Sequence, residues 1–387
     1  MSVLLLILIY IAFISLGLPD ALLGAGWPVM QPDLNVPYGF AGLAQMLISA
    51  GTIVSSICSG TAIKRFGTGR LTAASVAMTA AALLGFSAAP SFVWVLFAAL
   101  PLGLGAGAVD AALNAYVANH YESRHMSWLH SFWGVGALSG PLILSFLLLG
   151  GHSWRSGYLA VGSFQVLLVA ILLAAVPLWD KVRAVKTEKK PDAHRAVSMC
   201  TAVKIRGVPS ALLIFLFYGG IETTMGLWGG SFLFKVKGLD PALSATWVSL
   251  FFASITAGRF LTGVLTFRLS NNAMIGGGAL TVLGGILLLL APLPLPVSLV
   301  GFLLIGFGCA PIFPCMIHET PVRFGGGSSQ SIIGYQMAAA YTGAALLPPL
   351  FGFIANAAGM MLMPVFLITY ILILLANFLR LRHIRAA

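Results

Sequence analysis

Long apolar runs recur from one end of the chain to the other, and this pattern constrains the fold more than any other feature of the sequence. The runs are rich in Phe, Leu, Ile, Val and Ala. They extend for roughly 18 to 25 residues, enough for a helix to cross a hydrocarbon core of about 30 Å. Only 8% of the 387 residues are charged, whereas a soluble domain contains about a quarter. The sequence therefore predicts an all-α membrane protein.

The breaks between the runs predict twelve transmembrane helices in two groups of six. The one long polar segment, 179–208, is predicted to be a cytoplasmic linker. We therefore expect an N-terminal six-helix bundle over residues 1–178 and a C-terminal six-helix bundle over residues 209–387. No Lys or Arg precedes the first run, which indicates a span rather than a signal peptide. The expected spans are 3–29, 39–63, 71–90, 92–118, 128–150, 156–178, 210–234, 242–267, 272–291, 296–317, 329–356 and 360–380.

Basic residues gather in alternate loops, and this asymmetry predicts the orientation. If the N-terminus lies in the cytoplasm, the outside loops hold only Arg155, Lys235 and Lys237, and the other basic loop residues lie inside. The excess of positive charge then places both termini in the cytoplasm of a multi-pass protein of the cell inner membrane. The net charge of +11 thus reflects topology in a lipid bilayer, and we expect no nucleic-acid partner.

An internal repeat relates the two groups of spans. Because the matching residues follow the same order in both halves, the halves are related in parallel, which predicts two pseudo-symmetric bundles. At nearby offsets, Asp20 corresponds to Glu222 and Pro141 to Pro348. Pairs that share an offset of 203 residues are Gly60 and Gly263, Arg65 and Arg268, Gly103 and Gly306, and Gly105 and Gly308.

Several motifs resemble those of a known transporter family. GTAIKRFGTGR, residues 60–70, resembles the loop motif that major facilitators carry between their second and third spans. Four further segments resemble the branch that contains proton-coupled fucose, galactose and glucose permeases: GLPDALLGAGWP (17–28), GLGAGAVDAALNAYV (103–117), YGGIETTMGLW (218–228) and IFP (312–314). The resemblance covers nearly the whole chain. It implies the major facilitator fold, in which two six-helix halves rock about a solute held between them.

The loop motif departs from the family pattern at one position. Lys64 stands where the family usually has Asp, and this departure weakens the case for the family's cytoplasmic charge latch. The residues that we expect at a cytoplasmic gate are Lys64, Arg65, Arg70 and Arg268.

Three acidic residues lie at membrane depth, where each charge costs roughly 2.5 to 3.5 kcal/mol at the centre of a helix. They are Asp20 in the first span, Asp110 in the fourth and Glu222 in the seventh. The resemblance implies that Asp20 and Asp110 bind solute and couple its movement to protons. Glu222 corresponds to Asp20 in the repeat, which makes it a third candidate for binding solute and protons. The alternative is that these acids are polar contacts between helices, worth about 0.6 kcal/mol each.

Two groups of polar side chains extend the expected solute site. Asn114 lies one turn after Asp110, so that the amide and the carboxyl group together can donate to and accept from vicinal hydroxyls. Gln45 begins a polar stripe of helical period in the second span, which faces either water or a neighbouring helix. The other members of this stripe are Ser49, Thr52 and Ser56.

Aromatic and polar residues on later spans are further candidates for binding solute, with simple packing as the alternative for each. Arg259, near the cytoplasmic end of the eighth span, is expected to extend its side chain to the membrane interface. Trp128 is expected to belong to an aromatic belt at the interface. The candidates for solute binding are His130, Trp133, Trp228, Gln336 and Tyr341.

The motifs of enzymes and ATP-driven pumps do not occur in the sequence. It has no glycine loop that ends in Lys and Ser or Thr, and no cluster of metal ligands, so we expect no cofactor, metal or enzyme activity. The function predicted is secondary active transport of a small polar solute, with a sugar expected, together with protons, by alternating access in a monomer.

Two alternatives remain open at this point. One is a proton-driven exporter of drugs or metabolites, because GVGALSGPL (134–142) partly resembles a motif of such antiporters. The other, from a different class, is a non-transporting membrane sensor or a membrane enzyme.

Overall fold

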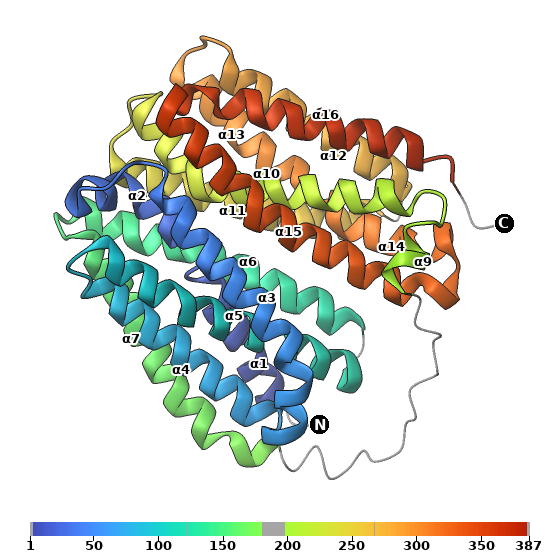
Figure 1. Cartoon of the computed structure of the whole chain (residues 1–387), viewed down its shortest axis with the longest axis horizontal. Helices are drawn as coiled ribbons and strands as arrows, with labels where there is room; N and C mark the ends of the chain where they lie inside the picture. The colour runs from blue at the N-terminus through green and yellow to red at the C-terminus, as the bar shows by residue number, and fades with distance from the viewer. Residues whose placement is uncertain (1–2, 122, 180–197, 267, 385–387) are drawn as a thin grey trace. The chain divides into compact units, whose positions relative to one another are not determined.

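The computed structural model describes residues 3–121, 123–179, 198–266 and 268–384, and in these residues the regular structure is helical (Figure 1). The helices before the linker are α1 (Val3–Gly17), α2 (Leu22–Leu34), α3 (Phe40–Phe66), α4 (Thr68–Ser87), α5 (Phe92–His120), α6 (Ser123–Leu149) and α7 (Trp154–Ala174). Those after it are α9 (Met199–Ala202), α10 (Val208–Lys235), α11 (Pro241–Leu265), α12 (Asn271–Leu290), α13 (Leu295–Cys309), α14 (Ile312–Phe324), α15 (Gly326–Ala358), the 3₁₀ turn η1 (Met360–Leu362) and α16 (Met363–Leu381).

Among the described residues, these helices form 12 segments that are long and apolar enough to cross a membrane. The expected all-α membrane fold is confirmed. Two spans contain a break that the apolar runs did not predict. The first span consists of α1 and α2, and the tenth of α13 and α14. Pro19 lies in the first break and Pro311 in the second, and proline removes a backbone donor and disfavours a continuous helix.

The repeat is visible in the positions of the helices. α4 and α12 begin at Thr68 and Asn271, α5 and α13 at Phe92 and Leu295, and α6 and α15 at Ser123 and Gly326, so that each pair differs by 203 residues. The glycines of the repeat meet equivalent neighbours. A Cβ on Gly105 would lie 2.5 Å from the carbonyl oxygen of Ser75, and one on Gly308 would lie 2.6 Å from that of Gly278. The shared offset therefore encodes the same close helix contact twice.

The chain groups into two compact units, which we describe separately. Unit 1 consists of Met1–Lys189 with Gly229–Ser249, and unit 2 of Lys190–Trp228 with Leu250–Ala387. The bundle boundaries expected from the sequence, 1–178 and 209–387, remain a prediction. Most of the expected linker, residues 180–197, lies outside the described residues.

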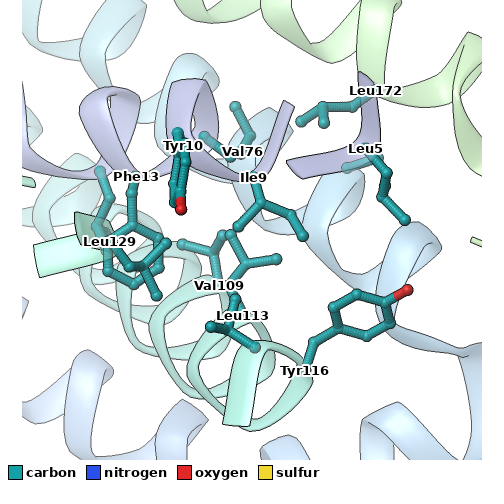
Figure 2. Packing of buried hydrophobic residues seen from close by; sticks show 14 of the residues in the cluster. Leu5, Ile9, Tyr10, Phe13, Val76, Val109, Leu113, Tyr116, Leu129 and Leu172 are labelled. Atoms are coloured by element: carbon teal, nitrogen blue, oxygen red, sulfur yellow. The ribbon is translucent and has the colours of Figure 1, made fainter. Parts of the chain in front are cut away.

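The core of unit 1 is a cluster of apolar side chains around α1. Ile9 is fully buried on α1, and it projects toward Val109 and Leu113 of α5 (Figure 2). Tyr10 is also part of the cluster, and its hydroxyl lies 2.7 Å from Nδ1 of His125 on α6. This packing holds the first span against the helices that carry the other candidate residues of unit 1.

The two units use different chemistry at equivalent ends of their helices. In unit 1, Tyr116 stacks on His120 with ring centroids 4.1 Å apart and meets the edge of Trp179 at 4.7 Å. The positions 203 residues later in the chain include Glu319 and Arg323. In unit 2, Nη2 of Arg323 lies 3.3 Å from Oε2 of Glu319, and its Nη1 donates to the carbonyl oxygen of Leu381 at 2.6 Å. An aromatic cluster in one unit thus corresponds to a charged network in the other.

Candidate functional site

Asp20 lies where the first span is unwound, between α1 and α2. The α-helical ladder continues to the bond from Leu18 N–H to the carbonyl of Ile14, and it then changes to the shorter bond from Asp20 N–H to the carbonyl of Gly17. Pro19 has no N–H to continue the ladder. The break turns the Asp20 side chain to an exposed position, although residues on both sides of it are buried.

A tryptophan from the fifth span holds the carboxyl group of Asp20. Nε1 of Trp133, on α6, donates to Oδ2 of Asp20 at 2.7 Å. The two helices approach closely here because glycines line the contact: a Cβ on Gly136 would lie 2.1 Å from the carbonyl oxygen of Ile14, and one on Gly140 would lie 2.0 Å from that of Leu18. The sequence predicted Asp20 and Trp133 as site residues separately, and the structure brings them together.

A small cavity adjoins Asp20 inside unit 1. Gln45 and Tyr158 also line this cavity, and its volume is about 30 Å³. That volume suits water, which needs about 10–15 Å³ measured in this way, whereas pockets for organic ligands measure about 300–1,000 Å³. Gln45 therefore shares a hydrated space with Asp20. A hexose would need more room than this cavity offers.

Asp110 and Asn114 are paired on α5. Nδ2 of Asn114 donates to Oδ1 of Asp110 at 2.8 Å and to its carbonyl oxygen at 3.0 Å. Both side chains are partly buried. The pair therefore combines carboxylate acceptors with an amide whose carbonyl oxygen is a further acceptor.

The polar stripe on α3 divides between the two alternatives that the sequence left open. Thr52 and Ser56 donate to the carbonyl oxygens of Gly103 and Gly107 on α5, at 3.2 and 3.1 Å. These two hydroxyls therefore face a neighbouring helix. Gln45, at the start of the stripe, faces the cavity beside Asp20.

Glu222 belongs to a charged cluster in unit 2. The hydroxyl of Tyr218, one turn earlier on α10, donates to Oε2 of Glu222. Nη2 of Arg259, on α11, lies 3.8 Å from the same carboxyl oxygen and 3.4 Å from the tyrosine hydroxyl. The side chains of Arg259 and Glu222 are 19% and 15% exposed. The expectation that Arg259 reaches for the membrane interface was wrong, because its guanidinium turns inward to a buried acid.

The remaining candidates for solute binding lie apart from the three acids or are used for packing. Trp228 is fully buried, and its Nε1 donates to the carbonyl oxygen of Pro348 at 2.8 Å. Gln336 is also fully buried, and its Oε1 accepts from Thr320 at 3.0 Å. These contacts favour the packing alternative for both residues. Tyr341 is 38% exposed, and His130 meets the edge of the Phe13 ring at a centroid distance of 6.0 Å.

The residues expected at a cytoplasmic gate are all exposed. Lys64, Arg65 and Arg70 lie at or next to the turn that joins α3 to α4, and Arg268 lies in the turn before α12. The guanidinium of Arg65 lies 5.3 Å from the centroid of the Phe66 ring. Their role in gating remains a prediction.

Sequence reasoning missed two further polar residues of unit 1. Gln165, on α7, is fully buried; its Nε2 donates to the carbonyl oxygen of Ser15, and its Oε1 accepts from Thr79 on α4. A single amide in the otherwise apolar middle of a span was the signal that could have identified Gln165, since polar groups at membrane depth need a partner.

Comparison with known proteins places this architecture in a family. The model of the Major Facilitator Superfamily matches residues 9–325. The chain belongs to this superfamily. The major facilitator is therefore a multi-pass membrane protein, and its relatives indicate a transporter of a small solute rather than an enzyme.

Individual relatives are distant but cover most of the chain. This major facilitator is 24% identical over 391 residues to Bypass of stop codon protein 6 of Saccharomyces cerevisiae, covering 92% of this chain and 77% of that protein. It is 25% identical over 321 residues to the glucose/mannose transporter GlcP of Bacillus subtilis, covering 79% of this chain and 77% of that protein. Among solved structures, a bacterial homolog of the human lysosomal transporter Spinster, inward-facing and occupied, matches with a TM-score of 0.76 at 13% identity, over 99% of this chain and 98% of that one. The structural likeness shows the shared fold.

Proposed function

We propose that this major facilitator carries a small polar solute, with a sugar as the expected class, together with protons by alternating access. It would act as a monomer in the cell membrane, with both termini in the cytoplasm. The observation that supports this proposal most directly is the exposed carboxyl group of Asp20, which lies at a break in a membrane span and accepts a hydrogen bond from Trp133. Unwound segments of this kind mark solute sites in many transporters.

The chemistry around Asp20 suits a polyhydroxylated solute. A carboxylate accepts hydrogen bonds from two hydroxyls at once, and an indole ring offers an apolar face with a polar edge. Because Trp133 occupies one oxygen of Asp20, the other oxygen has lone pairs for a solute hydroxyl. Asp110 and Asn114 form a second carboxyl and amide pair in the same unit.

The Glu222 cluster suits the binding and release of a proton. An ionised Glu222 attracts Arg259, whereas a protonated Glu222 leaves the guanidinium without this counter-charge, so that one proton changes the electrostatic balance of the site. A charge that must be sealed from water is costly, and protonation of a carboxyl group removes that cost. A proton that crosses a potential of 100 mV gains about 2.3 kcal/mol, enough for an accumulation of about fiftyfold.

A named relative supports the expected class of solute. The printed name of the Bacillus subtilis protein is glucose/mannose transporter, and the two chains align over most of their lengths. At 25% identity this relative is a guide to the first compounds to test.

The experiment begins with a thermal-shift screen of sugars, polyols and organic acids on the purified protein at two pH values. The compound that stabilises the protein is then tested for uptake into liposomes with and without an imposed proton gradient. We expect uptake above the equilibrium level only with the gradient. Uptake that ignores the gradient would contradict proton coupling, and stabilisation by organic acids alone would contradict the sugar assignment.

Asp110 supplies the sharper test of coupling. Asp110→Asn should abolish uphill uptake while solute exchange across the membrane survives, because the amide keeps an acceptor but cannot release a proton. The matched control is Asp240→Asn, since Asp240 accepts from Leu243 N–H at 2.9 Å at the start of α11 and an amide oxygen can do the same. Normal uphill uptake by Asp110→Asn would exclude Asp110 from coupling.

The orientation has a separate test. Cys200 is exposed beside α9. In a Cys58→Ser background, we expect a membrane-impermeant thiol reagent to label Cys200 in inside-out vesicles and not in intact cells. Labelling from the outside would reverse the proposed topology.

A further inference from the structure

The break beside Asp20 leaves one backbone carbonyl without its usual partner. In an unbroken helix, the N–H of residue 19 would donate to the carbonyl of Ser15, but proline has no N–H. The neighbouring donors are already used, because Leu18 N–H bonds to the carbonyl of Ile14 and Asp20 N–H bonds to that of Gly17. Instead, Nε2 of Gln165 donates to the carbonyl oxygen of Ser15 at 2.8 Å.

The amide of Gln165 can serve this carbonyl in one orientation only. A carbonyl oxygen only accepts, so the amide nitrogen must face Ser15, and the amide oxygen then faces Thr79, whose hydroxyl donates at 2.7 Å. Ser15, Thr79 and Gln165 are 1%, 3% and 0% exposed. Because water does not reach these groups, each would lose a hydrogen bond without the others.

A second proline break in the same chain shows that this arrangement is not automatic. Pro311 separates α13 from α14 and leaves the carbonyl of Phe307 without its α-helical donor. There the N–H of Ala310 folds back to the carbonyl of Phe307 at 3.3 Å. At the first break the corresponding N–H belongs to Leu18, which is bonded to Ile14, so that a side chain is needed from another helix.

The repeat provides an internal control. Pro19 corresponds to Ile221 at the offset that relates Asp20 to Glu222. α10 runs through this position without a break, and α16, the last span of the second half, contains no glutamine. The half that has the proline has the amide, and the half that lacks the proline lacks it.

We propose that Gln165 is a positioning residue, which replaces the backbone donor that Pro19 lacks and thereby fixes the break that presents Asp20 to Trp133. Thr79 orients the amide. The transport part of this proposal rests on the proposed role of Asp20 in solute binding. The structural part does not, and the two parts are tested separately.

The structural part is tested by a double-mutant cycle on the thermal stability of the purified protein. Gln165→Leu removes the donor to Ser15, and Pro19→Ala supplies a backbone N–H in its place. We expect Gln165→Leu to lower the unfolding temperature by several degrees in the wild-type background and by much less in the Pro19→Ala background. Equal losses in both backgrounds would overturn the proposal, because Gln165 would then not substitute for the proline's missing donor.

The transport part is tested by the solute concentration at half-maximal uptake. For Gln165→Leu we expect this concentration to rise about tenfold, the ratio that corresponds to one lost hydrogen bond to solute. The matched control is Asn377→Leu, which removes a buried amide that donates within its own helix to the carbonyl of Ile373 at 2.9 Å. We expect this control to lose stability without a rise in the half-maximal concentration.

The two failures are distinguishable. If Asp20→Asn transports normally, the proposed role of Asp20 is wrong, whereas the thermal cycle still decides the role of Gln165. If Asp20→Asn is inactive but Gln165→Leu has the wild-type half-maximal concentration, Gln165 does not position Asp20.

Discussion

Asp20 and Glu222 occupy matching positions in the two repeats, yet their surroundings differ in almost every respect. Asp20 lies exposed at a break between two helices and accepts from an indole N–H. Glu222 lies within the continuous helix α10, mostly buried, beside a tyrosine hydroxyl and a guanidinium. One proline accounts for part of the difference, since Pro19 has an isoleucine as its counterpart.

The comparison teaches that duplicated positions can divide a task. An exposed acid at a break is accessible to a solute, whereas a buried acid near a cation responds to a proton with a change in local charge. The scaffold that carries the two acids is shared, as the equivalent glycine contacts show. Four predictions follow the comparison from its largest expected effect to its smallest.

Asp20→Asn should reduce solute uptake by roughly 100-fold, since hydrogen bonds to a charged acceptor contribute up to about 3 kcal/mol. The amide oxygen can still accept from Trp133, so the fold should be retained. Uptake of the expected solute into liposomes is the measurement, with thermal stability as the control. Uptake within a factor of two of wild type would mean that Asp20 is a structural residue.

Arg259→Leu should destabilise the protein by about 3 kcal/mol, because it leaves the Glu222 carboxylate buried without its cation. The double variant Arg259→Leu with Glu222→Gln should recover much of the loss. Thermal unfolding of the purified proteins measures both effects. Additive losses in the double variant would show that the two side chains, 3.8 Å apart, do not interact.

Gly103→Ala and Gly306→Ala should each destabilise the protein by about 1–3 kcal/mol through overpacking. A Cβ would lie 2.0 Å from the carbonyl oxygen of Ile48 in the first case and 2.1 Å from Oγ of Ser254 in the second. Gly60→Ala and Gly263→Ala are matched controls, since a Cβ there meets nothing within 4 Å. If the paired variants differ strongly in stability, the two halves do not share the scaffold.

Trp133→Phe should raise the solute concentration at half-maximal uptake by about tenfold or less, because it removes one hydrogen bond to Asp20 and keeps an aromatic ring. The corresponding change in unit 2, Tyr218→Phe, removes the hydroxyl that donates to Glu222 and should act on the pH dependence of uptake instead. The two variants are compared in uptake assays over a range of pH. Identical effects would contradict the division of roles between the two acids.

The sequence predicted the twelve spans and the repeat because both depend on patterns that extend over many residues. Hydropathy identifies each span, and the offset of 203 residues recurs in the starts of three pairs of helices. The two breaks were not predicted, because proline is tolerated within membrane helices and does not by itself identify an unwound segment.

The candidate site was harder to predict because it depends on side-chain direction. The position of Arg259 near a helix end is compatible with both an interfacial and an inward guanidinium, and only the contact with Tyr218 and Glu222 decides between them. The interaction of Trp133 with Asp20 crosses from one span to another, which residue spacing cannot reveal. Gln165 was detectable as a lone amide, but its partner, a backbone carbonyl on α1, was not.

The grouping of Gly229–Ser249 with the first 189 residues has a consequence for any attempt to produce half of this protein. Ser145 bonds to the carbonyl of Ala242 and lies 2.6 Å from the hydroxyl of Thr246, and the ammonium group of Lys235 lies 3.5 Å from the ring centroid of Tyr38. A polypeptide that stops at the linker would lack these partners. The duplicated halves are therefore interlocked in their folding, and a split version should regain stability only when both pieces are expressed together.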